Sequence, residues 1–598
     1  MDRNNVEEKY KWNLKLIYKD EEQFNKDYNT VKNKINEFEK NEKIMNDNAE
    51  TFYNTINEYF NISRMLEKLM SYTNLLFDED TSNNKNQALK GKVEKLYNTY
   101  IEKSYFISSN ILKKEYTEIE KYYKKIPDLK KYEIIIKNEY RYKEHTLSDS
   151  EEKLLSNISK MLNNNYETYE LLKDSDLKYG KIINENNEEI EVSENNYSIL
   201  IESKNRETRK KAFKKLYEVY KQYANSFASL LSGNITENNT ISKIKKYDST
   251  LEWCLYKDEV NAEVYNNLIN TVEDNLDALY NYYNIKKELL KLDELHLYDI
   301  YVPIIDNYNK KYPFEEAKET VFKALNVLGD DYISILKKGI EDRWIDVYPT
   351  RNKRTGGYSG GCYDTNPYIL LNYQDKYNDM STLAHEAGHS MHSYYARSNN
   401  EYQYGDYTIF VAEVASTVNE LLLAKYLLKE SKDNNEKLAI LDKLMNLYKS
   451  TIFRQTMFAK FEKEIYEAAQ NDTVLTSEYL CNKYYEINKK YFGEGVIVDE
   501  EIKYEWERIP HFYYNFYVYK YATGLSAATQ IVENILSGKE NAVENYKEFL
   551  KCGSKKNPIE SLKLAEVDLN NSEVVKTALE MFDDICKEFK KIYKETLE

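Results

Sequence analysis

Hydrophobic residues recur along most of the chain at the three- and four-residue spacing of amphipathic helices. Residues 54–76 and 151–172 are examples, and short breaks rich in Asn and Asp separate such segments. The same periodicity resumes at residues 206–213 and returns after Leu421 as far as the end of the chain. The pattern predicts an all-α, mainly helical protein whose helices each keep a strongly solvated face.

Residues 179–192 interrupt this helical pattern. Two short runs with β-branched residues flank a turn rich in Asn and Glu, which predicts a β-hairpin. We place a boundary near it, between an N-terminal helical lobe at residues 1–195 and a second helical domain at residues 196–598. No linker rich in Pro, Gly or Ser separates the two, so we expect them to pack into one compact body.

A cluster of glycines forms the second interruption. Four of the 16 glycines fall within six residues, at positions 356, 357, 360 and 361, and residues 367–373 then read as a strand. In a chain so poor in glycine, the cluster indicates backbone that a ligand approaches closely. An ordinary hairpin between helices is the alternative.

Composition agrees with a helical fold and limits the classes of function. The 16 glycines and 7 prolines make up about 4% of the 598 residues, against about 12% on average, which is too few turn-forming residues for many short strands. The formal net charge of −16 leaves no basic surface for nucleic acid. No apolar run approaches the roughly 18 residues of a membrane span. We therefore expect a cytoplasmic protein, without a nucleic-acid, membrane or obligate protein partner.

The sequence contains the spacing His-Glu-x-x-His at His385, Glu386 and His389. Positions four apart share one face of a helix, so the two imidazoles can bind one zinc ion while Glu386 reaches the metal-bound water. Gly388 lies between them and costs about 1 kcal/mol relative to Ala in a helix. Its presence predicts close packing, which we expect against the strand that receives substrate. The five cysteines are scattered and suggest neither disulfides nor a thiolate zinc site.

A catalytic zinc ion takes three protein ligands and a water, so a third ligand is required. His392 is nearest in sequence, but the metzincin spacing HExxHxxGxxH is absent because Tyr395 occupies its last position. Glu413 is the better candidate, because it lies in an otherwise apolar run where a buried carboxylate needs a cation or hydrogen-bond donors. Glu420 continues the same helical face and is expected to orient a ligand imidazole. A buried Glu413 paired with Lys or Arg is the alternative.

The last histidine of the chain, His511, precedes a run of tyrosines. Five of the nine residues that begin at Tyr513 are tyrosines, where the composition predicts about one. Tyrosine hydroxyls and an imidazole can donate hydrogen bonds to the oxyanion that forms when water attacks a peptide carbonyl. An aromatic core helix is the alternative, which we favour for Tyr513, Tyr517 and Tyr519 individually.

Together these features resemble the thimet-oligopeptidase family of zinc metallopeptidases, and in particular its bacterial oligoendopeptidase F branch. The matching segments cover most of the chain and follow one another in the family's order. They are residues 10–14, the hairpin near Gly180, residues 246–249, 353–359 and 367–373, the His-Glu-x-x-His helix, and residues 410–420, 510–524 and 553–555.

The resemblance implies a two-lobed all-α body that encloses a deep channel, with one zinc ion per chain on the channel floor and short peptides as substrates. Residues 196–598 would then form the catalytic domain. The implied zinc ligands are His385, His389 and Glu413, and the implied catalytic base is Glu386. The implied transition-state donors are His511, Tyr514 and Tyr521, with Tyr517 as the substitute for either tyrosine.

An extended peptide substrate is expected to pair with a strand edge through main-chain hydrogen bonds. Residues 367–373 or the glycine-rich backbone before them could provide that edge, which makes Gly357 and Tyr358 candidate substrate contacts together with Tyr517. Two other functions remain open at this point. A zinc exopeptidase of similar architecture would share the same motif, and a peptide-binding protein could have lost catalysis.

Overall fold

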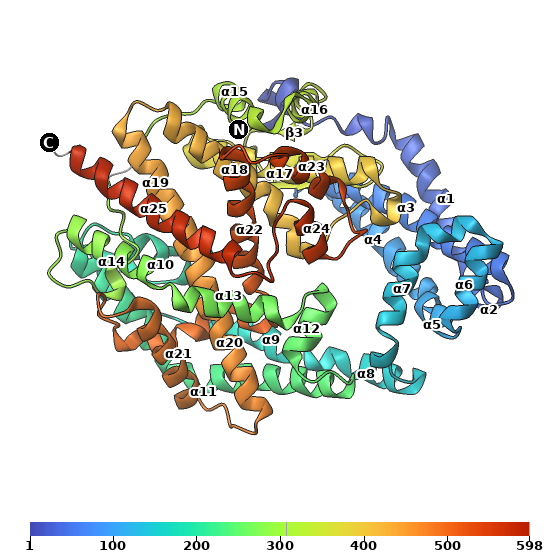
Figure 1. The fold of residues 1–598 in the computed structure, drawn as a ribbon, viewed down its shortest axis with the longest axis horizontal. Coiled ribbons are helices and arrows are strands. Elements are labelled where there is room, and N and C mark those ends of the chain that lie inside the picture. The colour runs from blue at the N-terminus through green and yellow to red at the C-terminus, as the bar shows by residue number, and fades with distance from the viewer. Residues whose placement is uncertain (306–307, 597–598) are drawn as a thin grey trace. The chain divides into compact units, whose positions relative to one another are not determined.

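The computed structural model describes residues 1–305 and 308–596 of the chain (Figure 1). Helices dominate, and the strands of these residues form one two-stranded and one three-stranded sheet. The predicted class, all-α with a small sheet element, is confirmed. None of the helices in the described ranges combines the length and the apolar character that a membrane crossing requires.

Contacts within the chain define two units, each assembled from three segments. Unit 1 comprises residues 1–144, 309–426 and 531–566, and unit 2 comprises residues 145–308, 427–530 and 567–598. The predicted boundary at residues 195/196 falls inside unit 2, so the contact-based units do not follow it. A separate N-terminal lobe of 195 residues and a deep channel stay predictions.

Unit 1 contains the three-stranded sheet and most of the N-terminal helices. Its helices are α1 (Glu21–Phe38), α2 (Asn41–Ile44), α3 (Ala49–Glu79), α4 (Asn84–Ser104), α5 (Phe106–Leu112), α6 (Tyr116–Lys125), α7 (Glu133–Arg141), α15 (Phe314–Leu325), α16 (Asp330–Glu341), α17 (Tyr377–Asn399), α18 (Ile409–Glu430), α23 (Ala542–Lys551) and α24 (Pro558–Leu564). The last residues of α18 belong to unit 2.

Unit 2 contains the two-stranded sheet and the remaining helices. These are α8 (Asp149–Leu162), α9 (Asn164–Leu171), α10 (Glu194–Ile201), α11 (Arg206–Ile244), α12 (Thr250–Asp258), α13 (Ala262–Asp274), α14 (Asp277–Leu289), α19 (Asn434–Tyr448), α20 (Arg454–Gln470), α21 (Ser477–Phe492), α22 (Tyr519–Leu536) and α25 (Glu573–Glu595), with the 3₁₀ helices η11 (Glu500–Arg508) and η12 (Pro510–Tyr513). The end of α22 belongs to unit 1.

Both predicted β elements are present. In unit 2, β1 (Lys181–Ile183) and β2 (Glu189–Glu191) form the antiparallel hairpin, with Ile182 opposite Ile190. In unit 1, β3 (Ile345–Asp346), β4 (Tyr358–Gly360) and β5 (Tyr368–Leu370) form a sheet in the order β3-β5-β4. The pairing of β3 with β5 is parallel and that of β4 with β5 is antiparallel.

The core of unit 1 joins this sheet to the N-terminal helices. Tyr368 and Leu370 of β5 belong to the same buried cluster as Phe24 of α1 and Phe52 of α3. Trp12 packs edge-on against Tyr368, with ring centroids 6.2 Å apart. Burial of these large side chains, each worth about 1.5–3 kcal/mol, holds the sheet rigidly beside α17.

Candidate functional site

The two histidines of the sequence motif lie on one face of α17, as predicted. Their Nε2 atoms are 3.2 Å apart. Glu413, in the first turns of α18, places its Oε2 at 3.3 Å from Nε2 of His385 and 3.4 Å from Nε2 of His389. Three possible ligand atoms from two helices therefore converge on one point, and they form a candidate metal site.

The dimensions of this triangle fit a tetrahedrally coordinated ion. Bonds of about 2.0–2.1 Å at tetrahedral angles separate neighbouring ligand atoms by about 3.3–3.4 Å. The three observed separations are 3.2, 3.3 and 3.4 Å. Two imidazoles and a carboxylate supply three such ligands and leave a fourth position free for water or substrate. The residues present therefore fit a catalytic metal ion.

Gly388 permits the approach of α17 and α18 that brings the ligands together. A Cβ at this position would lie 2.5 Å from the carbonyl oxygen of Ala415 and 2.6 Å from Cα of Ser416. Both are backbone atoms of α18 and cannot move aside cheaply. The predicted close packing of Gly388 is present, but the prediction of which element packs against it was wrong. Gly388 packs against α18, the helix that carries the candidate ligand Glu413, and not against the strand that we expected to receive substrate.

Glu413 is more exposed than its apolar neighbours indicated. Its side chain is 53% exposed, whereas the apolar sequence around it predicts a buried carboxylate. The surrounding residues of α18, such as Val414 and Ala415, are buried, so Glu413 occupies the accessible face of an otherwise internal helix. Hydrogen bonds from His385 and His389 hold the pKa of Glu413 well below its usual range.

Glu420, two turns further along α18, contacts the other nitrogen of His385. Its Oε2 lies 3.3 Å from Nδ1 of the imidazole, and its Oε1 accepts a hydrogen bond from Ser381 Oγ at 3.0 Å. Burial lowers the pKa of His385, but the hydrogen bonds to Glu413 and Glu420 outweigh this effect and raise the pKa to about 10. The carboxylate thus orients the ring and makes its Nε2 a stronger ligand.

Glu386, the carboxylate of the motif, is only 6% exposed, and its Oε2 has no hydrogen-bond partner. Burial raises the pKa of its carboxyl. Gly357 lies beside it, since a Cβ there would be 3.7 Å from Glu386 Oε1 and 3.0 Å from Thr382 Cγ2. The glycine-rich segment therefore passes directly next to an uncommitted carboxylate.

His392 does not contribute to the metal site. Its ring is 1% exposed and stacks on Tyr407 at a centroid distance of 3.6 Å, with Phe549 nearby at 5.1 Å. Burial lowers its pKa to about 3. His392 is a neutral core residue, which agrees with the preference for Glu413 over the histidine nearest in sequence.

The order of strands in the sheet shows which strand has a free edge that could pair with a peptide substrate. β5, within residues 367–373, is the central strand and pairs on both sides, so its backbone has no free edge there. Of the two alternatives for the edge that binds substrate, β5 is therefore excluded, and the glycine-rich backbone before it stays a prediction. β4 is an outer strand, and it continues from Gly357 beside Glu386. The side chain of Tyr358 is engaged elsewhere, because its hydroxyl donates to Asp78 Oδ2 at 2.7 Å.

His511 and the tyrosines form a second group, in unit 2. The ring of His511 lies 5.4 Å from Tyr514, 6.0 Å from Tyr521 and 6.5 Å from Tyr517, measured between centroids. Burial lowers the pKa of His511, which favours the neutral imidazole. Tyr513 instead stacks on Tyr169, with centroids 4.4 Å apart, and Tyr519 is fully buried. These two tyrosines are core residues, as the alternative reading held.

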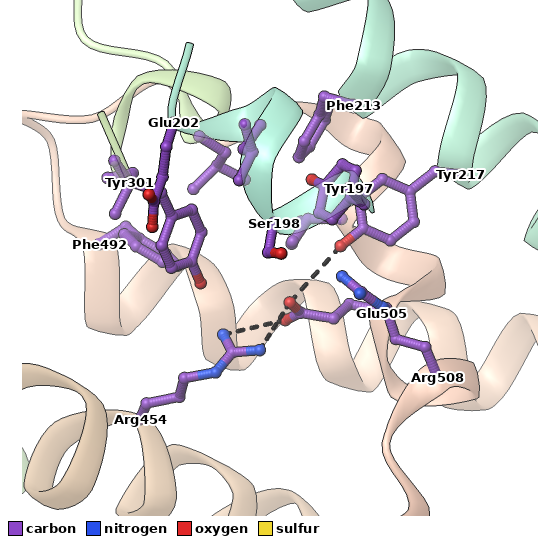
Figure 2. A pocket seen from close by; sticks show the side chains of 14 residues that line it. Tyr197, Ser198, Glu202, Phe213, Tyr217, Tyr301, Arg454, Phe492, Glu505 and Arg508 are labelled. Atoms are coloured by element: carbon purple, nitrogen blue, oxygen red, sulfur yellow. Dashed lines mark hydrogen bonds and ion pairs between the residues drawn. The ribbon is translucent and has the colours of Figure 1, made fainter. Parts of the chain in front are cut away.

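Ion pairs anchor the segment immediately before His511. Arg508, the last residue of η11, pairs with Glu194 at 2.5 Å. Arg454 pairs with Glu505 at 2.8 Å, and Tyr217 donates to the same carboxylate at 3.5 Å (Figure 2). Arg454, Glu505, Arg508 and Tyr217 line a cavity of about 290 Å³ in unit 2. This network could not be predicted from the sequence, because its members are distant from one another along the chain.

Comparison with known proteins identifies the family. The profile of peptidase family M3 matches residues 199–581, and that of oligopeptidase F matches residues 111–179. The chain belongs to peptidase family M3. It is 40% identical over 591 residues to the oligopeptidase PepF of Bacillus subtilis, covering 99% of this chain and 88% of that protein. An oligoendopeptidase F homolog of Borreliella burgdorferi is 37% identical, with 99% and 100% covered.

Solved structures agree with this assignment to the M3 family. A peptidase from Chlamydophila abortus superposes with a TM-score of 0.92 at 33% identity, over 99% of both chains. The oligoendopeptidase F of Enterococcus faecium gives a TM-score of 0.73 at 32% identity, over 96% of this chain and 99% of that one. The resemblance found in the sequence is confirmed, and with it the assignment of this M3 protein as a metalloendopeptidase.

Proposed function

We propose that this M3 peptidase is a zinc-dependent oligoendopeptidase that hydrolyses internal bonds of short peptides. The observation that carries the proposal is the triangle of His385 Nε2, His389 Nε2 and Glu413 Oε2 beside the uncommitted carboxylate of Glu386. Two imidazoles and one carboxylate are a frequent donor set of catalytic zinc sites. Relatives named oligopeptidases and oligoendopeptidases support short peptides as substrates.

In this proposal His385, His389 and Glu413 hold one zinc ion, and Glu420 keeps His385 in the correct tautomer. The bound ion would polarise the scissile carbonyl and lower the pKa of the attacking water. Glu420 accepts a hydrogen bond from the Nδ1–H of His385, which keeps the proton on Nδ1 and leaves the Nε2 lone pair available to the metal.

Glu386 acts as the general base. Its Oε2 has no competing hydrogen bond, and its raised pKa brings the carboxyl closer to the range in which it can both take and return a proton. It removes a proton from the attacking water and then delivers it to the nitrogen of the leaving amine. Gly357 leaves space beside the carboxylate, which a side chain would otherwise fill.

His511, Tyr514 and Tyr521 are proposed as hydrogen-bond donors to the oxyanion, with Tyr517 as the substitute. A neutral imidazole retains one N–H to donate, and loss of one oxyanion donor costs about 3 kcal/mol in other hydrolases. The outer edge of β4 is proposed to bind the substrate backbone. A cytoplasmic location remains part of the proposal.

Cleavage of an internally quenched peptide with both ends blocked tests the proposal. We expect cleavage at an internal bond, loss of activity with o-phenanthroline, recovery with Zn²⁺, and one zinc ion per chain by metal analysis. Glu386→Gln should retain the metal and lose turnover. Cleavage of only unblocked peptides would contradict endopeptidase action, and full activity of Glu386→Gln would contradict its role as base.

A further inference from the structure

A strained turn separates His511 and Tyr514 from Tyr517 and Tyr521. Its central residues, Asn515 and Phe516, have φ angles of 50° and 56°. Among the described residues they are the only two consecutive non-glycine residues with positive φ. Such backbone is unfavourable for L-amino acids, most of all for a bulky side chain such as Phe, and it persists only where surrounding structure enforces it.

One buried carboxyl holds the backbone of this turn. Glu462, on α20, accepts a hydrogen bond from the amide N–H of Phe516 through Oε1 at 2.7 Å. Its side chain is completely buried, and its Oε2 has no hydrogen-bond partner. Among the described residues, no Lys, Arg or His forms an ion pair with it. The carboxyl is therefore not neutralised by a partner, and its one interaction is with the strained turn.

Neighbouring side chains hold the rest of the turn. Tyr466, one turn after Glu462 on α20, donates to Oδ1 of Asn515 at 2.7 Å, and Asn515 Nδ2 donates to Asn238 at 2.8 Å. The ring of Phe516 is 1% exposed and packs against Tyr466, with centroids 4.8 Å apart. α20 thus fixes both residues of the turn, one through its side-chain amide and the other through its backbone.

The turn determines how the rings of four residues lie relative to one another, namely His511, Tyr514, Tyr517 and Tyr521. It joins η12, which carries His511, to α22, which carries Tyr521. If φ of either residue relaxed to a negative value, α22 would leave η12 at a different angle, and the centroid distances of 5.4–6.5 Å around His511 could not be kept. A buried carboxyl without a counter-ion is costly, and a leucine would fill the same space without that cost. The presence of a carboxyl at position 462 therefore indicates a specific role for Glu462.

We propose that Glu462 is a positioning residue for catalysis: by holding the amide of Phe516, it keeps His511 and the tyrosines in the geometry needed to stabilise the transition state. This rests on the proposed role of His511 and the tyrosines. Glu462 itself does not contact substrate. Its removal should lower kcat and leave KM nearly unchanged, because the donors act only once the oxyanion forms.

Three variants of the full-length protein test this role. Glu462→Leu removes the acceptor and keeps the volume, and Glu462→Gln keeps an acceptor oxygen. Ile465→Ala removes a buried apolar side chain of the same helix and leaves the hydrogen bonds to the turn in place. We expect kcat to fall about 10- to 100-fold in Glu462→Leu, as for small misplacements of catalytic groups. Glu462→Gln and Ile465→Ala should stay within about threefold of the wild-type protein. Unchanged kcat in Glu462→Leu, or an equal loss in Ile465→Ala, would overturn the proposal.

A measurement that does not depend on activity separates this proposal from the proposed function. With histidine labelled by ¹³C at Cε1, the six histidines give few enough signals to assign that of His511 by a His511→Gln variant. We expect this signal to shift in Glu462→Leu and to stay in place in Ile465→Ala. An inactive wild-type protein would refute the proposed peptidase function alone. An unmoved His511 signal in Glu462→Leu would refute positioning, whatever the activity.

Discussion

Glu420 and Glu413 lie on opposite edges of the His385 ring. Oε2 of Glu420 is 3.3 Å from Nδ1, and Oε2 of Glu413 is 3.3 Å from Nε2. Ser381 holds Glu420 in place by a hydrogen bond to its other oxygen. Glu420 therefore orients the imidazole through Nδ1, while Nε2 faces the other candidate ligands, Glu413 and His389.

Replacement of Glu420 by Gln should weaken metal binding without removing a ligand. The side-chain oxygen of an amide is a weaker acceptor than a carboxylate for the hydrogen bond from Nδ1–H of His385, so we expect a 10- to 100-fold loss of zinc affinity. Competition with a fluorescent chelator measures this change. Ser381→Ala is a milder companion variant, with an expected smaller loss in the same direction. Wild-type affinity in Glu420→Gln would show that the contact does not tune the site.

Gly388→Ala should destabilise the protein, although alanine has the better helix propensity. The new methyl group would meet backbone atoms of Ala415 and Ser416 at 2.5–2.6 Å and force α17 and α18 apart. We expect a loss of about 1–3 kcal/mol, typical of overpacking, together with weaker metal binding. Thermal unfolding with and without Zn²⁺ measures both effects.

Gly91→Ala provides the matched control for Gly388→Ala. Gly91 lies within α4, where an added Cβ would meet no atom within 4 Å. Propensity alone predicts a gain of about 1 kcal/mol at that position. If both substitutions raised the unfolding temperature, the close approach of α17 and α18 would not constrain the site.

Metal binding should release protons at neutral pH. The pKa of His385 is raised to about 10, so below that pH the ring carries a proton that a metal ion must displace from Nε2. Apparent affinity therefore rises with pH, by about tenfold per unit for one proton between pH 6 and 8. Calorimetry in buffers of different ionisation enthalpy counts the protons. An affinity independent of pH in this range would contradict the raised pKa.

The stability of the protein should respond to the titration of Glu462. Burial raises its pKa in the folded protein to about 8, above the value of 4.5 for an exposed glutamate. Between these values the folded state holds a proton that the unfolded state has lost, so the free energy of unfolding falls as pH rises from about 4.5 to 8. Glu462→Gln should flatten this part of the profile. Thermal unfolding at pH 5 and 8 compares the two proteins, and parallel profiles would refute the assignment.

Substrate backbone amides should matter if the outer edge of β4 binds peptide. N-methylation of one substrate amide removes an N–H that would donate a hydrogen bond to a backbone carbonyl of β4. We expect KM to rise about tenfold and kcat to be retained. A series of peptides methylated at successive positions locates the paired residues. Equal KM values across the series would argue against strand pairing.

Much of the metal site was predictable because it depends on local geometry. His385 and His389 are one helical turn apart, and any helix through them places both imidazoles on one face. Glu413 and Glu420 could be assigned since each is a charged residue in an otherwise apolar helical run. The exposure of Glu413 was not predictable, because it depends on which face of α18 the rest of the fold leaves uncovered.

The helical class, the small β elements, the peptidase family and the candidate metal-binding motif could all be predicted from the amino-acid sequence. These follow from periodicity, composition and residues near one another along the chain. Three features are visible only in the folded protein: Gly388 packs against α18, β5 is a central strand, and Glu462 holds the turn at Asn515 and Phe516. Each of these depends on contact between segments far apart in sequence, where packing and unsatisfied backbone groups, rather than local propensity, select the arrangement.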